Sequence, residues 1–138
     1  MASAEEVARR LYGEVGVRQG IFTAEALAHA QRSAPQQHPG DALMAAGVIS
    51  RGQHKGLLRA VEYRQGRDED KRIAQILVDN RYCAGDMVRR ALATQKQVYA
   101  KSGKLVRISA LLLENGTLTA SQKTAARKLF ELGRGPGE

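Results

Sequence analysis

The stretch Gly47-Val48-Ile49-Ser50 carries the pattern that decides the fold, because it recurs as Gly20-Ile21-Phe22-Thr23 and Gly116-Thr117-Leu118-Thr119. Each copy has a glycine first, an apolar residue third and a Ser or Thr fourth. A glycine adopts the left-handed conformation that ends a helix, and the apolar residue packs against the next helix. The Ser or Thr caps that next helix. The pattern therefore predicts helices joined by short turns.

Residues around these turns favour the same interpretation. A fourth, weaker copy is Arg81-Tyr82-Cys83-Ala84, where we expect Asn80 to take the left-handed conformation instead of a glycine. Three Ser or Thr residues are followed three positions later by Gln or Glu, the spacing of a capping box. They are Ser3 with Glu6, Ser50 with Gln53, and Thr119 with Gln122.

The chain is expected to be all-α, with tandem helix–turn–helix repeats packed as a small helical bundle. Its 138 residues suit one domain, expected over 1–132, and its 43% hydrophobic and 4% aromatic residues predict an aliphatic core. Repeat units are predicted near 3–33, 38–65, 69–101 and 105–132, with a disordered tail over 133–138. Helices are predicted near 3–18, 23–33, 40–46, 50–65, 69–80, 84–101, 105–115 and 119–132.

Composition limits the compartment and the partners. Cys83 is the only cysteine, so no internal disulfide is possible, and a cytoplasmic location is expected. The N-terminus lacks the features of a signal peptide, and the longest apolar run is too short for membrane insertion. A net charge of +8 favours anionic partners, although a solvated basic surface would give the same balance.

No catalytic or metal site is expected, and the chain is interpreted as a binding module rather than an enzyme. The three histidines lack ligand spacing, and one cysteine cannot build a Cys-rich zinc site. The run 101–104 lacks the upstream glycine of a phosphate-binding loop. Asp68-Glu69-Asp70 is expected to open a helix, where carboxylates favour the positive end of the helix dipole.

Positive charge concentrates late in the chain. No acidic residue lies between Asp86 and Glu114, and the connection from Lys96 to Arg107 is predicted to form a positive surface. Arg72 and Arg107 precede similar apolar patterns, each at the predicted start of a helix. A cation is unfavourable there, so the recurrence suggests a role in binding. The alternative is an exposed arginine whose aliphatic stem covers an apolar face.

Residues 72–95 resemble the motif of the MshEN domain, the N-terminal domain of type II secretion and type IV pilus assembly ATPases. The match consists of the opening arginine, the aliphatic positions and the final glutamine. These are Arg72, Ile73, Leu77, Val88, Leu92 and Gln95, with Ala74 and Arg81 in place of two glycines. The next unit repeats the opening as Arg107-Ile108-Ser109 and keeps Leu112 and Gly116. It then departs from the motif, because Lys123 and Arg127 stand where the family has leucines.

The resemblance implies a non-enzymatic regulatory or adaptor module with a protein partner in a secretion, pilus or motility system. It also implies cyclic di-GMP as a candidate ligand, with arginines on phosphates or guanine edges and aliphatic walls against the bases. No other cofactor is expected. The implied ligand-binding residues are Arg72, Ile73, Ala74, Val88, Leu92, Gln95, Arg107, Ile108 and Ser109.

Two alternatives remain open. Helical repeats commonly present an extended surface to another protein, so the chain could be an interaction scaffold without a small ligand. Nucleic-acid binding ranks third, because aromatic residues for base stacking are scarce and the charge is spread along the chain.

Overall fold

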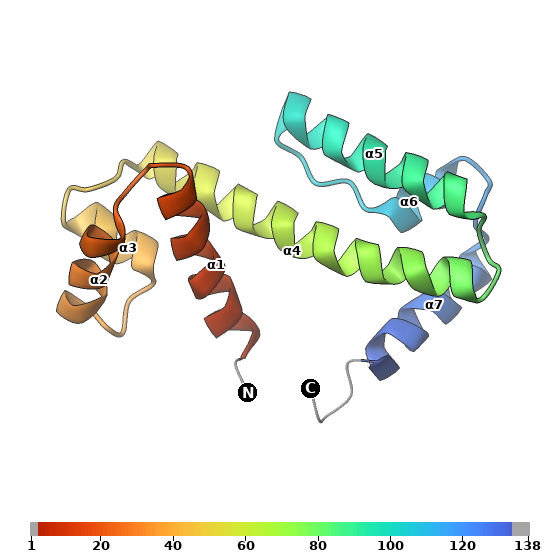
Figure 1. Ribbon diagram of the computed structural model, residues 1–138, viewed down its shortest axis with the longest axis horizontal. Coiled ribbons are helices and arrows are strands. Elements are labelled where there is room, and N and C mark those ends of the chain that lie inside the picture. Colours follow the sequence, from red (N-terminus) through yellow and green to blue (C-terminus); the bar gives the residue numbers. More distant parts are fainter. Residues whose placement is uncertain (1–2, 134–138) are drawn as a thin grey trace. The chain divides into compact units, whose positions relative to one another are not determined.

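The computed structural model describes residues 3–133, and this part of the chain is built from α-helices with no strand (Figure 1). The prediction of an all-α fold is confirmed. The helices are α1 (Ala4–Arg18), α2 (Ala24–Ser33), α3 (Pro39–Ala45), α4 (Arg51–Asp79), α5 (Gly85–Ser102), α6 (Ile108–Glu114) and α7 (Ala120–Gly133). The predicted disordered tail over 133–138 starts at Gly133, which the structure instead has as the last residue of α7, and residues 134–138 lie outside the described part of the chain.

The chain divides into two compact units, unit 1 (Met1–Glu62) and unit 2 (Tyr63–Glu138). Unit 1 covers the predicted segment 3–33 and all but the last three residues of 38–65, and unit 2 covers the segments 69–101 and 105–132. Helix α4 contributes residues to both units. In unit 1, α1, α2, α3 and the first turns of α4 enclose a core with Tyr12, Leu43 and Leu57 fully buried. Burial of such side chains is the main favourable contribution to folding, about 1.5–3 kcal/mol each.

Unit 2 has its own core, formed by the rest of α4 with α5, α6 and α7. Leu77, Ile108 and Leu112 are fully buried there, and Phe130 of α7 closes the cluster. Cys83 is also buried, as its place in the turn pattern predicts, and burial raises the pKa of its thiol. Leu129, next to Phe130, is 38% exposed and is not part of this core.

The turns match the expected chemistry with one exception. Gly20, Gly47 and Gly116 have φ values of 71°, 75° and 78°, the left-handed conformation that ends a helix. In the weak copy this conformation belongs to Arg81, with φ 58°, and not to Asn80. The prediction for Asn80 was wrong because its side-chain amide donates to the Ile76 carbonyl at 2.8 Å and so remains part of the helix end.

The caps after these turns are also as expected. Ser50 and Gln53 form a reciprocal capping box with bonds of 2.9 and 3.1 Å, and Thr119 and Gln122 repeat it at 3.0 and 3.1 Å. At the amino end the Ser3 hydroxyl accepts from the Glu6 amide at 3.1 Å.

Helix α4 differs from the prediction of two helices, 50–65 and 69–80, because it runs without interruption from Arg51 to Asp79 (Figure 1). Gly66 does not break it. Instead the Leu105 side chain packs against Gly66, where an added Cβ would lie 2.5 Å from Leu105 Cδ2. Asp68-Glu69-Asp70 therefore lies within a helix rather than at its start, and so does Arg72. None of the described helices is both long and apolar enough to cross a membrane.

Candidate functional site

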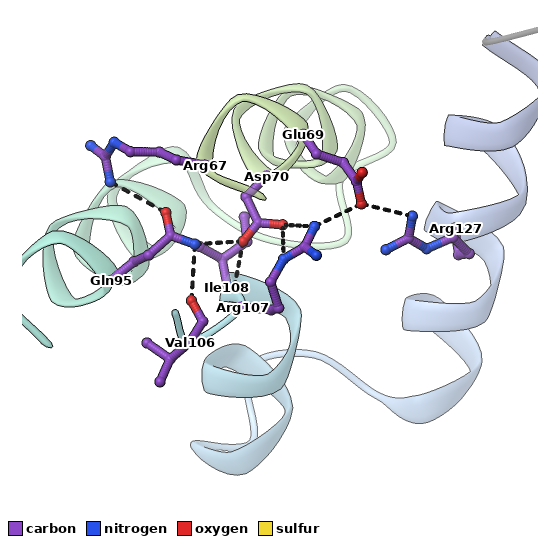
Figure 2. Close-up of polar contacts among 8 residues, drawn as sticks. All are labelled: Arg67, Glu69, Asp70, Gln95, Val106, Arg107, Ile108 and Arg127. Atoms are coloured by element: carbon purple, nitrogen blue, oxygen red, sulfur yellow. Dashed lines mark hydrogen bonds and ion pairs between the residues drawn. The ribbon is translucent and has the colours of Figure 1, made fainter. Parts of the chain in front are cut away.

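A buried carboxylate, Asp70, organises the polar interior of unit 2 (Figure 2). Its side chain is about 1% exposed, and both of its oxygens are hydrogen-bonded. Oδ2 accepts from Gln95 Nε2 at 2.7 Å and from the Ile108 amide at 3.0 Å. Oδ1 accepts from Arg107 Nε at 3.0 Å and from Arg107 Nη2 at 2.8 Å. One side chain of α4 thus binds both α5 and the start of α6.

Arg107 extends this network toward α7. Its Nη2 also donates to Glu69 Oε1 at 2.7 Å, and Arg127 Nη1 donates to the same oxygen at 3.1 Å (Figure 2). The bonds to Asp70 raise the pKa of Arg107 despite its partial burial, with Glu69 adding to the effect. Burial alone would raise the pKa of Glu69, but the hydrogen bonds from the two arginines outweigh it and lower that pKa.

Gln95 completes the network on the α5 side and is fully buried. Its Nε2 donates to the Val106 carbonyl at 2.9 Å as well as to Asp70. Its Oε1 accepts from Arg67 Nη1 at 3.3 Å, and Arg67 also donates to the Leu92 carbonyl at 2.8 Å. Both polar groups of the Gln95 side chain are therefore hydrogen-bonded to other residues of unit 2, which is typical of a structural role.

Most of the nine residues that the MshEN resemblance implies for ligand binding lie inside unit 2. The aliphatic ones are core residues, since Ile73, Ala74, Val88 and Ile108 are each at most 6% exposed. Leu92 packs against the same core and is partly buried. Gln95 and Arg107 belong to the Asp70 network, so their side chains already have partners.

Arg72 and Arg107 contact different residues of unit 2. The Arg72 guanidinium lies over the Phe130 ring, 5.2 Å from its centroid, and Arg127 lies at the same distance from that ring. Such cation–π contacts stabilise by about 0.5–1 kcal/mol at exposed sites. Arg107 instead faces Asp70 and Glu69. The two arginines are thus in one unit but have different partners.

Unit 2 does have an open groove, of about 570 Å³, which we call the α6–α7 groove. Its apolar lining comes from α4, α6, the turn before α7 and two alanines of α7, and its charged lining comes from α7. The residues that line it are Ile73, Leu77, Ser109, Leu113, Leu118, Ala120, Lys123, Thr124, Ala126, Arg127, Lys128 and Glu131. Only Ile73 and Ser109 of the nine implied residues are among them.

Unit 1 has a polar cluster of different chemistry. The Tyr12 hydroxyl and His54 Nδ1 are hydrogen-bonded at 2.7 Å, and the His38 ring lies edge-on to Tyr12 with centroids 4.8 Å apart. His38 Nδ1 caps α3 by accepting from the Gly40 amide at 2.9 Å. Burial, assisted by Asp41, raises the pKa of Tyr12 to about 12.

The pKa of His38 is lowered, first by burial and then by the neighbouring His54. Arg9 acts in the same direction, whereas Asp41 and Glu5 oppose it. His38 Nδ1 must be unprotonated to accept the hydrogen bond from the Gly40 amide, and the lowered pKa of His38 favours that neutral form.

Comparison with known proteins adds no relative: no family model matches the chain, and no curated protein or solved structure matches it significantly. The MshEN resemblance therefore rests on the motif residues alone.

The Asp70 network was missed in the sequence because its members are far apart, with Arg107 thirty-seven positions from Asp70. One signal was present. Asp70 is in register with Ile73, Ala74 and Leu77 at the i, i+3, i+4, i+7 spacing of a buried helix face. A carboxylate on such a face needs a buried partner. The basic groove gave a weaker signal in Lys123 and Arg127, which replace the leucines of the motif.

Proposed function

We propose that the chain is a non-enzymatic regulatory or adaptor module of the secretion-ATPase N-terminal type, and that it acts by binding a partner protein in the α6–α7 groove. The observation that carries the proposal is the groove itself, which combines an apolar lining with three cations on one helix. Leu113, at its edge, is 37% exposed. An exposed apolar surface bordered by charge is typical of protein contact sites.

The polar groups of unit 2 support a binding role over a catalytic one. Asp70, Arg107 and Gln95 are engaged with one another, so they fix the positions of α4, α5 and α6. A rigid scaffold of this kind lowers the entropic cost of binding at a neighbouring surface.

We also infer that the segments near 3–33, 38–65, 69–101 and 105–132 are tandem repeats. The left-handed residues at Gly20, Gly47, Arg81 and Gly116 support this, because each ends one helix shortly before the next begins. Repeats of this type present extended contact surfaces.

The adaptor proposal is tested with a photo-reactive phenylalanine analogue placed at Leu113 in the full chain, expressed in its own cells. A specific adduct with one partner is expected on irradiation. The matched position is Leu132, which is 76% exposed and does not line the groove. Equal yields at both positions, or no adduct at Leu113, would contradict the proposal.

Cyclic di-GMP is the second candidate occupant, favoured by Ser109, Lys123 and Arg127 in the same groove. A hydroxyl and two cations suit the phosphates of a dinucleotide. Calorimetry with cyclic di-GMP should give binding that Lys123→Ala weakens about tenfold, the equivalent of one charge-assisted hydrogen bond. Arg72→Ala tests the motif arginine in the same assay. A folded protein that gives no heat at high ligand concentration would exclude this ligand.

A further inference from the structure

We infer that the α6–α7 groove receives an acidic amphipathic helix of the partner protein. This inference rests on the adaptor function proposed above and adds the chemistry of the partner. The groove has two distinct sides. Leu77, Leu118 and Ala126 are almost fully buried and form its apolar floor, and Leu113 extends that floor to the surface.

The basic side of the groove favours an acidic partner. Lys123 and Lys128 are exposed and form no ion pair with any residue that the structure describes. Arg127, between them, binds Glu69 but keeps 42% of its side chain exposed. Glu131 is the single carboxylate in the lining, so three cations face one anion. Charge complementarity of this kind selects partners and accelerates their association.

The dimensions of the groove favour a helix. Its α7 residues run from Ala120 to Glu131, twelve positions that span roughly 16 Å, or about three helical turns. An amphipathic helix of that length can place apolar side chains at i, i+3, i+4 and i+7 on the floor. Its acidic residues then lie opposite the α7 cations. The lining has no aromatic side chain on which a base could stack.

Two positions of unit 1 that correspond in sequence to groove residues carry different side chains. Tyr12 lies eight residues before the left-handed Gly20, and Ile73 lies eight residues before the left-handed Arg81, so these two positions correspond. In the same way His54, seven residues after Gly47, corresponds to Lys123, seven residues after Gly116. In unit 1 the Tyr12 and His54 side chains are joined by a hydrogen bond and lie against Gly40, where an added Cβ would overlap both.

Unit 2 has a smaller aliphatic residue and a solvated cation at these two positions. Ile73 and Lys123 both line the groove, and Lys123 is one of its three cations.

The test is a selection of displayed random peptides of about 16 residues, long enough for the expected three-turn helix, against the full chain. Enriched peptides should be acidic, with Leu, Ile or Val at helical spacing. Synthetic copies are then measured by fluorescence anisotropy. Lys123→Glu with Lys128→Glu should weaken binding about tenfold or more, and Leu113→Lys should do the same.

Lys96→Glu with Lys101→Glu is the matched control, because it makes the same change in net charge at exposed positions of α5. It should change the affinity by no more than about twofold. Circular dichroism checks that each variant is folded. A selection that yields no peptides, or neutral or basic ones, would overturn the inference, as would equal weakening by both charge reversals.

The outcomes also separate this inference from the adaptor proposal. If Leu113 forms a crosslinked adduct but the selection yields no acidic peptides, the adaptor proposal is retained and the inference of an acidic helix is overturned. Cyclic di-GMP binding that is lost in the Lys123→Glu and Lys128→Glu variant, without acidic peptides, assigns the groove to the dinucleotide and overturns the inference.

Discussion

Asp70 is the residue on which most of the polar structure of unit 2 depends. It accepts four hydrogen bonds from three residues, two of them from the charged Arg107. Removal of one partner from a buried ion pair leaves the other charge uncompensated, which costs more than the pair itself contributes. The Arg107 side chain is 34% exposed, so water offsets part of that cost.

We predict that Asp70→Asn lowers the free energy of unfolding by about 2–3 kcal/mol, because the amide turns a hydrogen-bond donor toward Arg107 or the Ile108 amide. Urea unfolding followed by circular dichroism measures the change. Asp68→Asn is the control: Asp68 is exposed on the same helix, and its substitution should stay within about 0.5 kcal/mol. Similar losses in the two variants would contradict a special role for Asp70.

At the scale of the elements, the turn at Arg81 is the least favourable of the four. A non-glycine residue pays about 1 kcal/mol in the left-handed conformation. Arg81→Gly should therefore stabilise the chain by about 0.5–1 kcal/mol, and Gly116→Ala should destabilise it by a similar amount because Gly116 has φ 78°. Thermal and urea unfolding test both variants. Destabilisation by Arg81→Gly would mean that the arginine side chain contributes more than its backbone strain costs.

Helix starts whose capping residues all lie in one short stretch of sequence were predicted correctly. Ser50 and Gln53 supply both halves of a capping box, so the start of α4 follows from four residues. The continuity of α4 could not be predicted in this way. Gly66 and the three acids after it resemble a helix boundary, and only the packing of Leu105 and the burial of Asp70 make them part of the helix interior.

The candidate site was less predictable than the fold for the same reason. Ile73 and Val88 are apolar at helical spacing whether they line a ligand site or a core, and the structure has them in the core. Arg107 was predicted to bind a ligand, but in the structure its guanidinium is bonded to Asp70 of another helix. Tertiary contacts decide such roles.

At the scale of the whole molecule, the two units depend on groups that titrate in different pH ranges. His38 has a lowered pKa in unit 1, so its neutral form is favoured by folding. The stability that it contributes is complete above its unfolded pKa of 6.5 and is lost as the pH falls below that value. Glu69 has a lowered pKa in unit 2, so its contribution is present above 4.5 and is lost only as the pH falls through its lower folded value.

We therefore predict that unit 1 weakens first on acidification. Between pH 7 and pH 5.5, amide exchange protection, corrected for intrinsic rates, should fall at Leu43 and Leu57 of unit 1 more than at Leu77 and Leu112 of unit 2. This window spans the unfolded pKa of His38, 6.5, and stays above that of Glu69, 4.5.

His38→Asn decides whether the histidine cap is the cause of this difference. An asparagine side chain still accepts a hydrogen bond at the start of α3 but does not titrate, so the loss of protection in unit 1 should shrink. His29→Asn is the matched control, because His29 is exposed and its substitution should leave the pH response unchanged. An equal fall of protection in both units, or an unchanged fall in His38→Asn, would show that the protonation of this cap does not govern the acid response of unit 1.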